Sequence, residues 1–309
     1  EPETVETIRS DVQWEELENL KYIAKGAFCV VYSAQFQGLK IAVKKLRNDV
    51  KVSTGQRLMK AELKMLQQTD HENIVRLLGS GICEEPAEHV FLILEFISDG
   101  SLADFLSHRN SPSIPQNARG ISIPDCLDFG VAFADAMSYL HHNACEAHFL
   151  LHRDLKPDNI GFSGGKLKLM DFGLAKFMPR QVANETGTYK MTGDTGTLRY
   201  MAPEVAVHQP YNEKADVYSF SLILWQLLTL ERPFEGMSAD DYYDYVVEQH
   251  VRPTLFEEWP AGLRELLHRC WHKRHSRRPN FPEVLSALKR LRAAYDDSLG
   301  RSPRSRHSS

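Results

Sequence analysis

The chain has 309 residues, of which 42% are apolar and 25% charged, and this composition is typical of a folded globular protein and excludes disorder as its main state. Lysine and arginine total 37 against 41 acidic residues, so the net charge is −4 and no overall positive field attracts nucleic acid. The longest apolar run, at 90–94, is far shorter than the ~20 residues of a transmembrane helix. We therefore expect neither a nucleic-acid partner nor a membrane span.

The first residues and the cysteines give expectations about the native start of the chain and its cellular compartment. The stretch Glu1-Pro2-Glu3-Thr4 is acidic, is not a signal peptide and lacks an initiator methionine, so we do not expect it to be the native start. Five cysteines, with no C-x-x-C pair among them, argue against a disulfide framework. We expect a reducing, intracellular and cytoplasmic setting.

In chain order, residues 1–19 are expected to be an N-terminal extension, and residues 20–97 a small strand-rich lobe. Its strands are predicted by apolar runs at 20–24, 29–35, 40–46, 77–82 and 90–95. One helix is predicted at 54–68, and its apolar face includes Glu62. A carboxylate on that face needs a buried partner.

Residues 98–295 are expected to form a larger, helical lobe. The predicted helices lie at 101–108, 124–142, 214–229, 240–249, 260–270 and 281–295. The helix at 214–229 is apolar on every side near its centre, which indicates a buried helix. Residues 296–309 are rich in arginine and serine, which predicts a disordered basic tail. The predicted fold class is α+β with two lobes, a small antiparallel sheet with one helix and a larger mostly helical lobe.

The most specific motif is His152-Arg-Asp-Leu-Lys-Pro-Asp-Asn159, followed twelve residues later by Asp171-Phe-Gly173 and then by Ala202-Pro-Glu204. Ala42-Val-Lys44 stands in a predicted strand and Glu62 on the predicted helix. These motifs have the order and spacing of the protein kinase signature. From about 20 to 291, the chain resembles protein kinases and is expected to have their bilobal fold.

The resemblance extends to a group within that family and bears on the substrate. Residues 196–204, with Ser219-Phe220 and Cys270-Trp271, look most like the tyrosine-kinase-like group of Ser/Thr kinases. Lys156 and Thr197 are similar to the residues of Ser/Thr-specific members. The resemblance therefore implies a protein substrate with a Ser or Thr hydroxyl, with dual specificity left open.

Five residues would be catalytic if the resemblance holds. Phosphoryl transfer requires the terminal phosphate of ATP to be held in line with a hydroxyl while its charge is neutralised. Lys44, on the third predicted strand, would grip the α and β phosphates with Glu62 paired to it. Asp154 would take or orient the proton of the substrate hydroxyl, and Lys156 would steady the transferring phosphate. Thr197 completes this implied set.

The resemblance also implies ATP and Mg²⁺ as cofactors. Asn159 and Asp171 have oxygen ligands that suit Mg²⁺. The adenine ring would pack against the side chains of Val31 and Ala42 and against the gatekeeper Leu94. It would hydrogen bond to the hinge backbone at Glu95 and Ile97. Taken alone, the apolar members of this set are equally ordinary core residues.

The phosphate loop departs from the family. Where Gly-x-Gly-x-x-Gly is expected, the chain reads Ala24-Lys-Gly26-Ala-Phe-Cys29 and keeps only the middle glycine. Side chains at two glycine positions are expected to lower nucleotide affinity or loop mobility. Cys29 has two interpretations: a reactive thiol close to Lys44 that bound ATP protects, or a small, partly buried replacement for glycine.

Further residues are expected to hold or switch the site. Glu204 is expected to pair with Arg278, and Asp216 to bond the backbone of the catalytic loop. Arg153 would remain unpaired until an upstream kinase phosphorylates a hydroxyl of the activation segment. The candidate hydroxyls are those of Thr186, Thr188, Tyr189, Thr192 and Thr195.

The function that these expectations favour is that of an ATP-dependent protein serine/threonine kinase. A nucleotide-binding pseudokinase that acts as a scaffold is the alternative, motivated by Ala24 and Cys29. A kinase of small molecules is less favoured, because Thr197 and Ala202-Pro-Glu204 are typical of a surface for a peptide hydroxyl.

Overall fold

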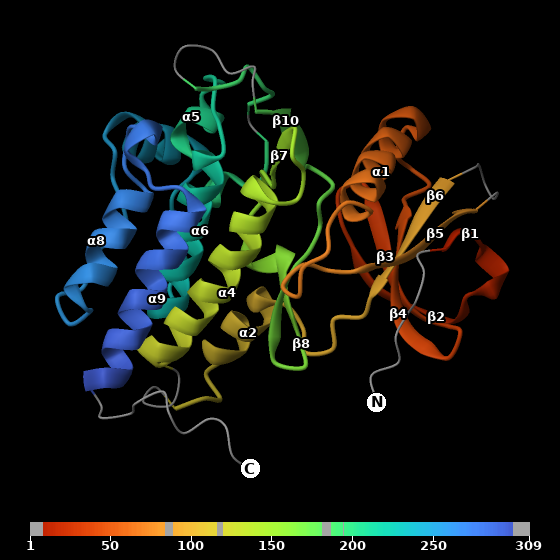
Figure 1. Cartoon of the computed structure of the whole chain (residues 1–309), viewed down its shortest axis with the longest axis horizontal. Helices are drawn as coiled ribbons and strands as arrows, with labels where there is room; N and C mark the ends of the chain where they lie inside the picture. The colour runs from red at the N-terminus through yellow and green to blue at the C-terminus, as the bar shows by residue number, and fades with distance from the viewer. Residues whose placement is uncertain (1–8, 84–88, 116–119, 181–186, 194, 299–309) are drawn as a thin grey trace. The chain divides into compact units, whose positions relative to one another are not determined.

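The computed structural model describes residues 9–83, 89–115, 120–180, 187–193 and 195–298, and Figure 1 labels most of its helices and strands. These residues form two compact units. One contains the described residues up to Gly100 together with Gly161–Lys176, and the other contains Ser101–Ile160 and the described residues from Phe177 onward. The predicted lobes, 20–97 and 98–295, therefore differ from the two units in one respect, because Gly161–Lys176 belongs to the first unit.

The first unit contains a six-stranded sheet in the order β1-β5-β6-β4-β3-β2. Five strands lie where the apolar pattern predicts them and pair antiparallel; they are β2 (Glu18–Lys25), β3 (Cys29–Phe36), β4 (Leu39–Leu46), β5 (Leu77–Cys83) and β6 (His89–Glu95). Ile41 and Val43 of β4 pack in one cluster with Phe91 and Ile93 of β6. The alternation of apolar and polar residues in the sequence thus reflects the two faces of each strand.

The sixth strand, β1 (Arg9–Gln13), corrects the expectation of a separate extension at 1–19. It pairs parallel with β5, so the sheet is mixed, and the 3₁₀ helix η1 (Trp14–Glu16) follows it. Val12 and Leu17 are buried in the core of the first unit. A five-residue edge strand with one buried side chain has no apolar alternation to predict it. Because β1 precedes the others, Lys44 lies on the fourth strand and not the third.

Two further segments complete the first unit. Helix α1 (Val52–Leu66) packs against β6 and buries Glu62 between Met59 and Met65, as the apolar face predicted. The hairpin of β8 (Ile160–Ser163) and β9 (Lys166–Leu169) belongs to this unit because Asn73 Nδ2 donates to Leu167 O at 2.9 Å. These contacts bring the segment that follows β9 to the sheet.

The second unit is built around α6 (Lys214–Thr229), whose residues 215–227 are all buried. Helix α4 (Ile123–His142) lies along α9 (Phe281–Ser298), as Figure 1 shows, and α8 (Ala261–Cys270) packs on α6. The rings of Phe133, Phe220 and Phe281 join α4, α6 and α9, with centroids 5.0 and 5.6 Å apart. The helix predicted as buried is therefore the centre of this unit.

The remaining elements of this unit are short. They are α2 (Leu102–Arg109), β7 (His148–Leu151), η2 (Pro157–Asn159), β10 (Lys176–Pro179), η3 (Leu198–Tyr200), α5 (Pro203–Ala206) and η5 (His275–Arg277). The helix predicted at 240–249 is instead α7 (Ala239–Asp241) followed by the π-helix η4 (Tyr242–Glu248). Helix α9 continues into the predicted tail at 296–309, the rest of which lies outside the described residues. No described helix is both long and apolar enough to cross a bilayer.

The predicted pair of Glu204 and Arg278 is confirmed and is buried. Arg278 Nη1 and Nη2 donate to the two carboxylate oxygens of Glu204 at 2.6 and 2.8 Å. Arg278 also donates to His272 O and Lys214 O, so one guanidinium joins α5, α6 and the loop after α8. Burial alone would raise the pKa of Glu204, but Arg278 outweighs it and holds the pKa below the usual 4.5.

We predict that Glu204→Gln lowers the free energy of unfolding by roughly 3–5 kcal/mol at pH 7, because it leaves the buried Arg278 without its counter-charge. A carboxyl with a lowered folded pKa stabilises above its unfolded pKa of 4.5 and loses that contribution as the pH falls through the folded value. The difference between wild type and variant should therefore shrink below about pH 4.5 in urea unfolding. A difference that stays constant down to pH 3 would contradict the assignment.

Candidate active site

Lys44, Glu62 and Asp171 form a cluster inside the first unit. Lys44 Nζ lies 2.7 Å from both carboxylate oxygens of Glu62 and 2.8 Å from Asp171 Oδ1. The side chains of Lys44 and Glu62 are only 9% and 2% exposed, so this is no surface salt bridge. Burial alone would lower the pKa of Lys44, but Glu62 and Asp171 raise it above its usual value. The ammonium therefore stays charged.

Asp171 is held in an unusual backbone conformation after β9. Its φ is +56°, in the left-handed region, and its Oδ1 also accepts from Gly173 N at 3.2 Å. A Cβ on Gly173 would lie 3.2 Å from that oxygen, so a side chain there would press on the Asp171 carboxylate. The Asp171 side chain is half exposed, whereas the neighbouring Phe172 is buried. Asp171 can thus meet both Lys44 and a group from outside.

A second cluster lies inside the second unit, where Asp154 is the centre of a network. Its Oδ1 accepts from the backbone N and Oγ1 of Thr197 at 3.0 and 3.1 Å, and its Oδ2 is 2.9 Å from Lys156 Nζ. Lys156 Nζ donates to Thr197 Oγ1 at 3.1 Å. Asn159 Nδ2 donates to the backbone oxygen and Oδ2 of Asp154 at 2.8 and 3.1 Å. The structure thus brings four predicted residues together around one oriented carboxylate.

The loop that carries Asp154 is fixed by Asp216, as predicted. Asp216 accepts from the backbone N of His152 and of Arg153 at 2.9 and 3.0 Å, and it contacts His141 Nε2 at 2.9 Å. Burial alone would raise the pKa of Asp216, but His141 and the other donors lower it, so the carboxylate is ionised. In the sequence, His141 stands out only as part of a His/Cys cluster that matches no zinc pattern, and its bond to Asp216 is not predicted.

The predicted adenine-pocket residues lie at neighbouring positions of the sheet. Ala42 of β4 is opposite Leu94 of β6, and Val31 of β3 is opposite Lys44. The carboxylate of Glu95 pairs with Lys168 at 2.8 Å, and its backbone N–H donates to Arg76 O at 2.9 Å, so neither group is free for a ligand. Ile97 packs beside Gly161, where a Cβ would lie 2.6 Å from Ile97 Cγ2.

The loop that departs from the glycine pattern is held by Arg47, which the sequence analysis did not single out. Gly26 N donates to Cys29 O at 2.8 Å, which closes a tight turn between β2 and β3. Arg47 Nη1 donates to the carbonyls of Gly26 and Ala27 at 3.0 and 2.9 Å. Side-chain hydrogen bonds thus order a loop in which Ala24 and Cys29 replace two glycines.

Cys29 fits the second of its two interpretations. Its side chain is partly buried, and Sγ lies 3.4 Å from Met59 Sδ. Burial raises the pKa of this thiol to about 11, although Lys44 acts in the opposite direction. A thiol of that pKa is protonated at neutral pH, so Cys29 is better described as a small replacement for glycine than as a reactive thiolate.

Part of the activation segment is packed within the second unit, to which it belongs. Tyr189 pairs through its backbone with Tyr211, and Thr188 is buried. Arg153 Nη1 donates to Thr192 Oγ1 at 3.2 Å, so the expectation of an unpaired Arg153 is wrong. A hydroxyl accepts this hydrogen bond in place of a phosphate. Thr186 lies outside the described residues.

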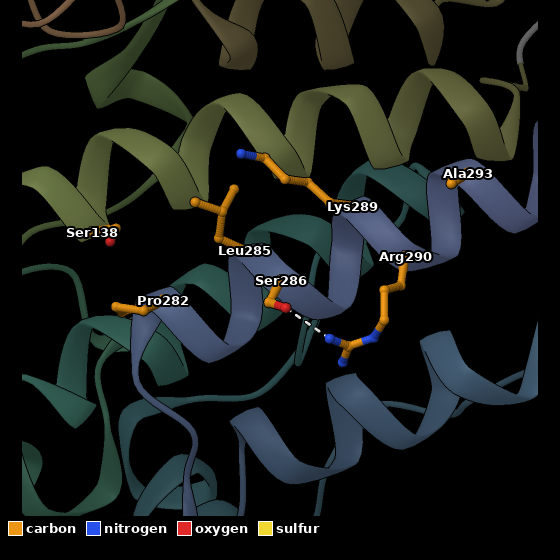
Figure 2. Close-up of a pocket in the computed structure, with 7 residues that line it drawn as sticks. All are labelled: Ser138, Pro282, Leu285, Ser286, Lys289, Arg290 and Ala293. Atoms are coloured by element: carbon orange, nitrogen blue, oxygen red, sulfur yellow. Dashed lines mark hydrogen bonds between the residues drawn. The ribbon is translucent and has the colours of Figure 1, made fainter. Parts of the chain in front are cut away.

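A shallow groove of about 460 Å³ lies elsewhere in the second unit, on α4 and α9. Figure 2 shows its lining residues, which are Ser138, Pro282, Leu285, Ser286, Lys289, Arg290 and Ala293. None of the residues predicted for catalysis or nucleotide binding lines this groove. It is therefore not the candidate active site.

Comparison with known proteins agrees with this geometry. The family model described as protein tyrosine and serine/threonine kinase matches residues 17–288. The serine/threonine-protein kinase VIK of Arabidopsis thaliana is 34% identical over 282 residues, which are 89% of this chain and 60% of the relative. Human mitogen-activated protein kinase kinase kinase 7 is 31% identical over 284 residues, 91% of this chain and 43% of the relative.

The chain thus spans about half the length of these relatives, between 43% and 60%. A further relative, the serine/threonine-protein kinase STY46 of Arabidopsis thaliana, is 33% identical over 90% of this chain. The extent of the match and the two side-chain clusters show that the chain belongs to the protein tyrosine and serine/threonine kinase family, in its tyrosine-kinase-like group.

Proposed function

We propose that this protein is an ATP-dependent protein kinase that transfers the γ-phosphate to Ser or Thr hydroxyls of a protein. The observation that carries the proposal is the buried ion pair of Lys44 with Glu62, which Asp171 extends. Burying two charges costs free energy, which their mutual attraction offsets only when the geometry is good, so such a pair is rarely retained for stability alone. Here the carboxylates of Glu62 and Asp171 keep the Lys44 ammonium charged on the sheet, where it could bind phosphate oxygens.

The residues of this chain have separable roles in such a transfer. Lys44 would hold the α and β phosphates of ATP through charge-assisted hydrogen bonds. Asp154, already oriented by Thr197 and Asn159, would accept or align the proton of the substrate hydroxyl. Lys156 would neutralise charge on the transferring phosphate, since its ammonium lies beside Asp154.

The donor set fits Mg²⁺ in chemical type. Asp171 offers a half-exposed carboxylate, and Asn159 uses its amide nitrogen towards Asp154, so its amide oxygen is the atom for a cation. Mg²⁺ prefers such oxygens and keeps several waters besides. When bound with ATP, the ion would neutralise phosphate charge. Asn159 and Asp171 are the residues that would hold it.

Specificity for Ser and Thr is supported by the link between Lys156 and Thr197, which ties the catalytic loop to the segment before Ala202-Pro-Glu204. The relatives VIK and STY46 are both named serine/threonine-protein kinases. A cytoplasmic setting belongs to the same proposal, because all five cysteines are free thiols, as a reducing compartment allows.

The direct test is transfer of label from γ-labelled ATP, with Mg²⁺, to the protein itself and to a general protein substrate. We expect labelled phosphoserine and phosphothreonine after acid hydrolysis. Labelled phosphotyrosine as well would establish dual specificity. Nucleotide binding with no transfer would instead favour the scaffold alternative that Ala24 and Cys29 motivate.

We predict that two aspartates separate binding from chemistry. Asp154→Asn should lower kcat roughly 10²- to 10⁴-fold and leave ATP affinity nearly unchanged. Asp171→Asn should also remove the Mg²⁺-dependent part of ATP binding, measured by calorimetry with and without the metal. Asp240→Asn, at an exposed position, is the matched control. Wild-type turnover in either of the first two variants would contradict the assignment.

Thr192 is the expected site of activation by an upstream kinase, because its exposed hydroxyl already meets Arg153. A phosphate there would form stronger, charge-assisted bonds with that guanidinium. Phosphatase treatment should lower activity several-fold, and Thr192→Ala should abolish the effect. Ser107→Ala, at an exposed position of α2 outside this segment, serves as the control. Unchanged rates after complete dephosphorylation would show a constitutively ordered enzyme.

A further inference from the structure

Arg180, directly after β10, makes an unusual set of contacts with the end of α4. Its guanidinium donates to four backbone carbonyls, at 3.0 Å to His141, 2.9 Å to His142, 3.2 Å to Cys145 and 3.1 Å to Glu146. The last carbonyls of a helix have no partners within the helix, and a cation is favourable beside them. The planar fork of arginine suits several acceptors at once. Arg180 therefore caps α4 from a different segment of the chain.

The backbone of Arg180 continues the same connection. Its N–H donates to Ala147 O at 3.1 Å, beside the two-stranded ladder of β7 and β10. A ladder of two strands is marginally stable alone, so contacts at its end decide whether it persists. Strand β7 ends at Leu151, and the next residues are His152, Arg153 and Asp154. The hydrogen bond from Arg180 to Ala147 thus stabilises β7, the strand that leads directly into the catalytic loop.

A second connection runs through His141. Its carbonyl accepts from Arg180, while its Nε2 is hydrogen bonded to Asp216, which holds the backbone N–H groups of His152 and Arg153. Arg153 has a φ of +67°, in the left-handed region that a residue with a Cβ rarely adopts. Such a conformation persists only where its surroundings enforce it. His141 and Asp216 provide those surroundings.

We propose that Arg180 is a positioning residue for phosphoryl transfer, which holds Asp154 in place through β7 and through His141 and Asp216. The inference rests on the proposed kinase activity. In this role Arg180, which follows Asp171 in the chain, would control the geometry of the catalytic loop, and both Arg180 and that loop lie in the second unit. Because the Arg180 side chain is exposed, its replacement leaves no buried cavity and the variants should fold.

The test compares Arg180→Met with a matched control, Arg252→Met. Arg252 also donates to backbone carbonyls in the second unit, at 2.9 Å to Trp271 and 2.9 Å to Val246, but it makes no contact with the described catalytic-loop residues. We expect Arg180→Met to lower kcat about 10- to 100-fold with the KM for ATP within about two-fold. Arg252→Met should retain kcat. Arg180→Lys should be intermediate, since one ammonium cannot reach four carbonyls.

Hydrogen exchange provides a readout that does not need activity. The amides of His152 and Arg153 should exchange faster in Arg180→Met than in wild type, and at the wild-type rate in Arg252→Met. All assays are run well below the midpoint of thermal unfolding of each variant. An inactive wild type would overturn the proposed function, whereas equal exchange in wild type and Arg180→Met would overturn this inference.

Variants of His141 test the second connection. His141→Phe keeps the ring that packs on Phe281 but loses the hydrogen bond to Asp216, whereas His141→Gln keeps a donor. We expect kcat to fall in the first variant and to be largely restored in the second. Combined with Arg180→Met, His141→Phe should have less than its full single effect. Strictly additive effects on kcat would overturn the route through His141.

Discussion

A buried carboxylate must be paired or hydrogen bonded, and this constraint organises both units. Among the described residues, the buried carboxylates are Glu62, Asp154, Glu204 and Asp216. Each one joins segments that are distant in the sequence: Glu62 brings α1 to β4, Glu204 brings α5 to Arg278, and Asp216 brings α6 to the catalytic loop. The charges that build the scaffold and the charges proposed for chemistry are therefore held by the same kind of pairing.

Two of the eight described non-glycine residues with positive φ lie where the chemistry is proposed. Arg153 and Asp171 have φ values of +67° and +56°, and Gly196 has +103°. A Cβ on Gly196 would lie 2.5 Å from Arg153 O, so only glycine allows the close approach of this segment to the catalytic loop. Strain of this kind is maintained by surrounding contacts, which here come from Asp216 and from the lysine at β4. In the second unit, Asp216 of α6 thus holds the backbone of the catalytic loop at His152 and Arg153.

The phosphate loop shows how a motif can change while its position in the fold persists. Glycines permit close approach of backbone to phosphate, but they also leave a loop poorly ordered. In this protein Arg47 binds the carbonyls of Gly26 and Ala27, and Cys29 packs on Met59. Order therefore comes from side chains at the ends of β4 and within α1. Two groups that would act on ATP, Lys44 and Asp171, are present and paired beside this loop's sheet.

Local patterns determined much of this protein from the sequence alone. Period-two runs predicted five strands, helical periodicity predicted α1, α4, α6, α8 and α9 to within a few residues, and motif spacing identified Lys44, Glu62, Asp154 and Asp171. Tertiary structure decided what no local pattern records: the parallel β1, the return of 161–176 to the first unit, and the contacts of Arg153, Arg180 and His141. These depend on which distant groups meet a side chain. An arginine in a loop or a histidine at the end of a helix looks the same in sequence whether it meets solvent or buried polar groups.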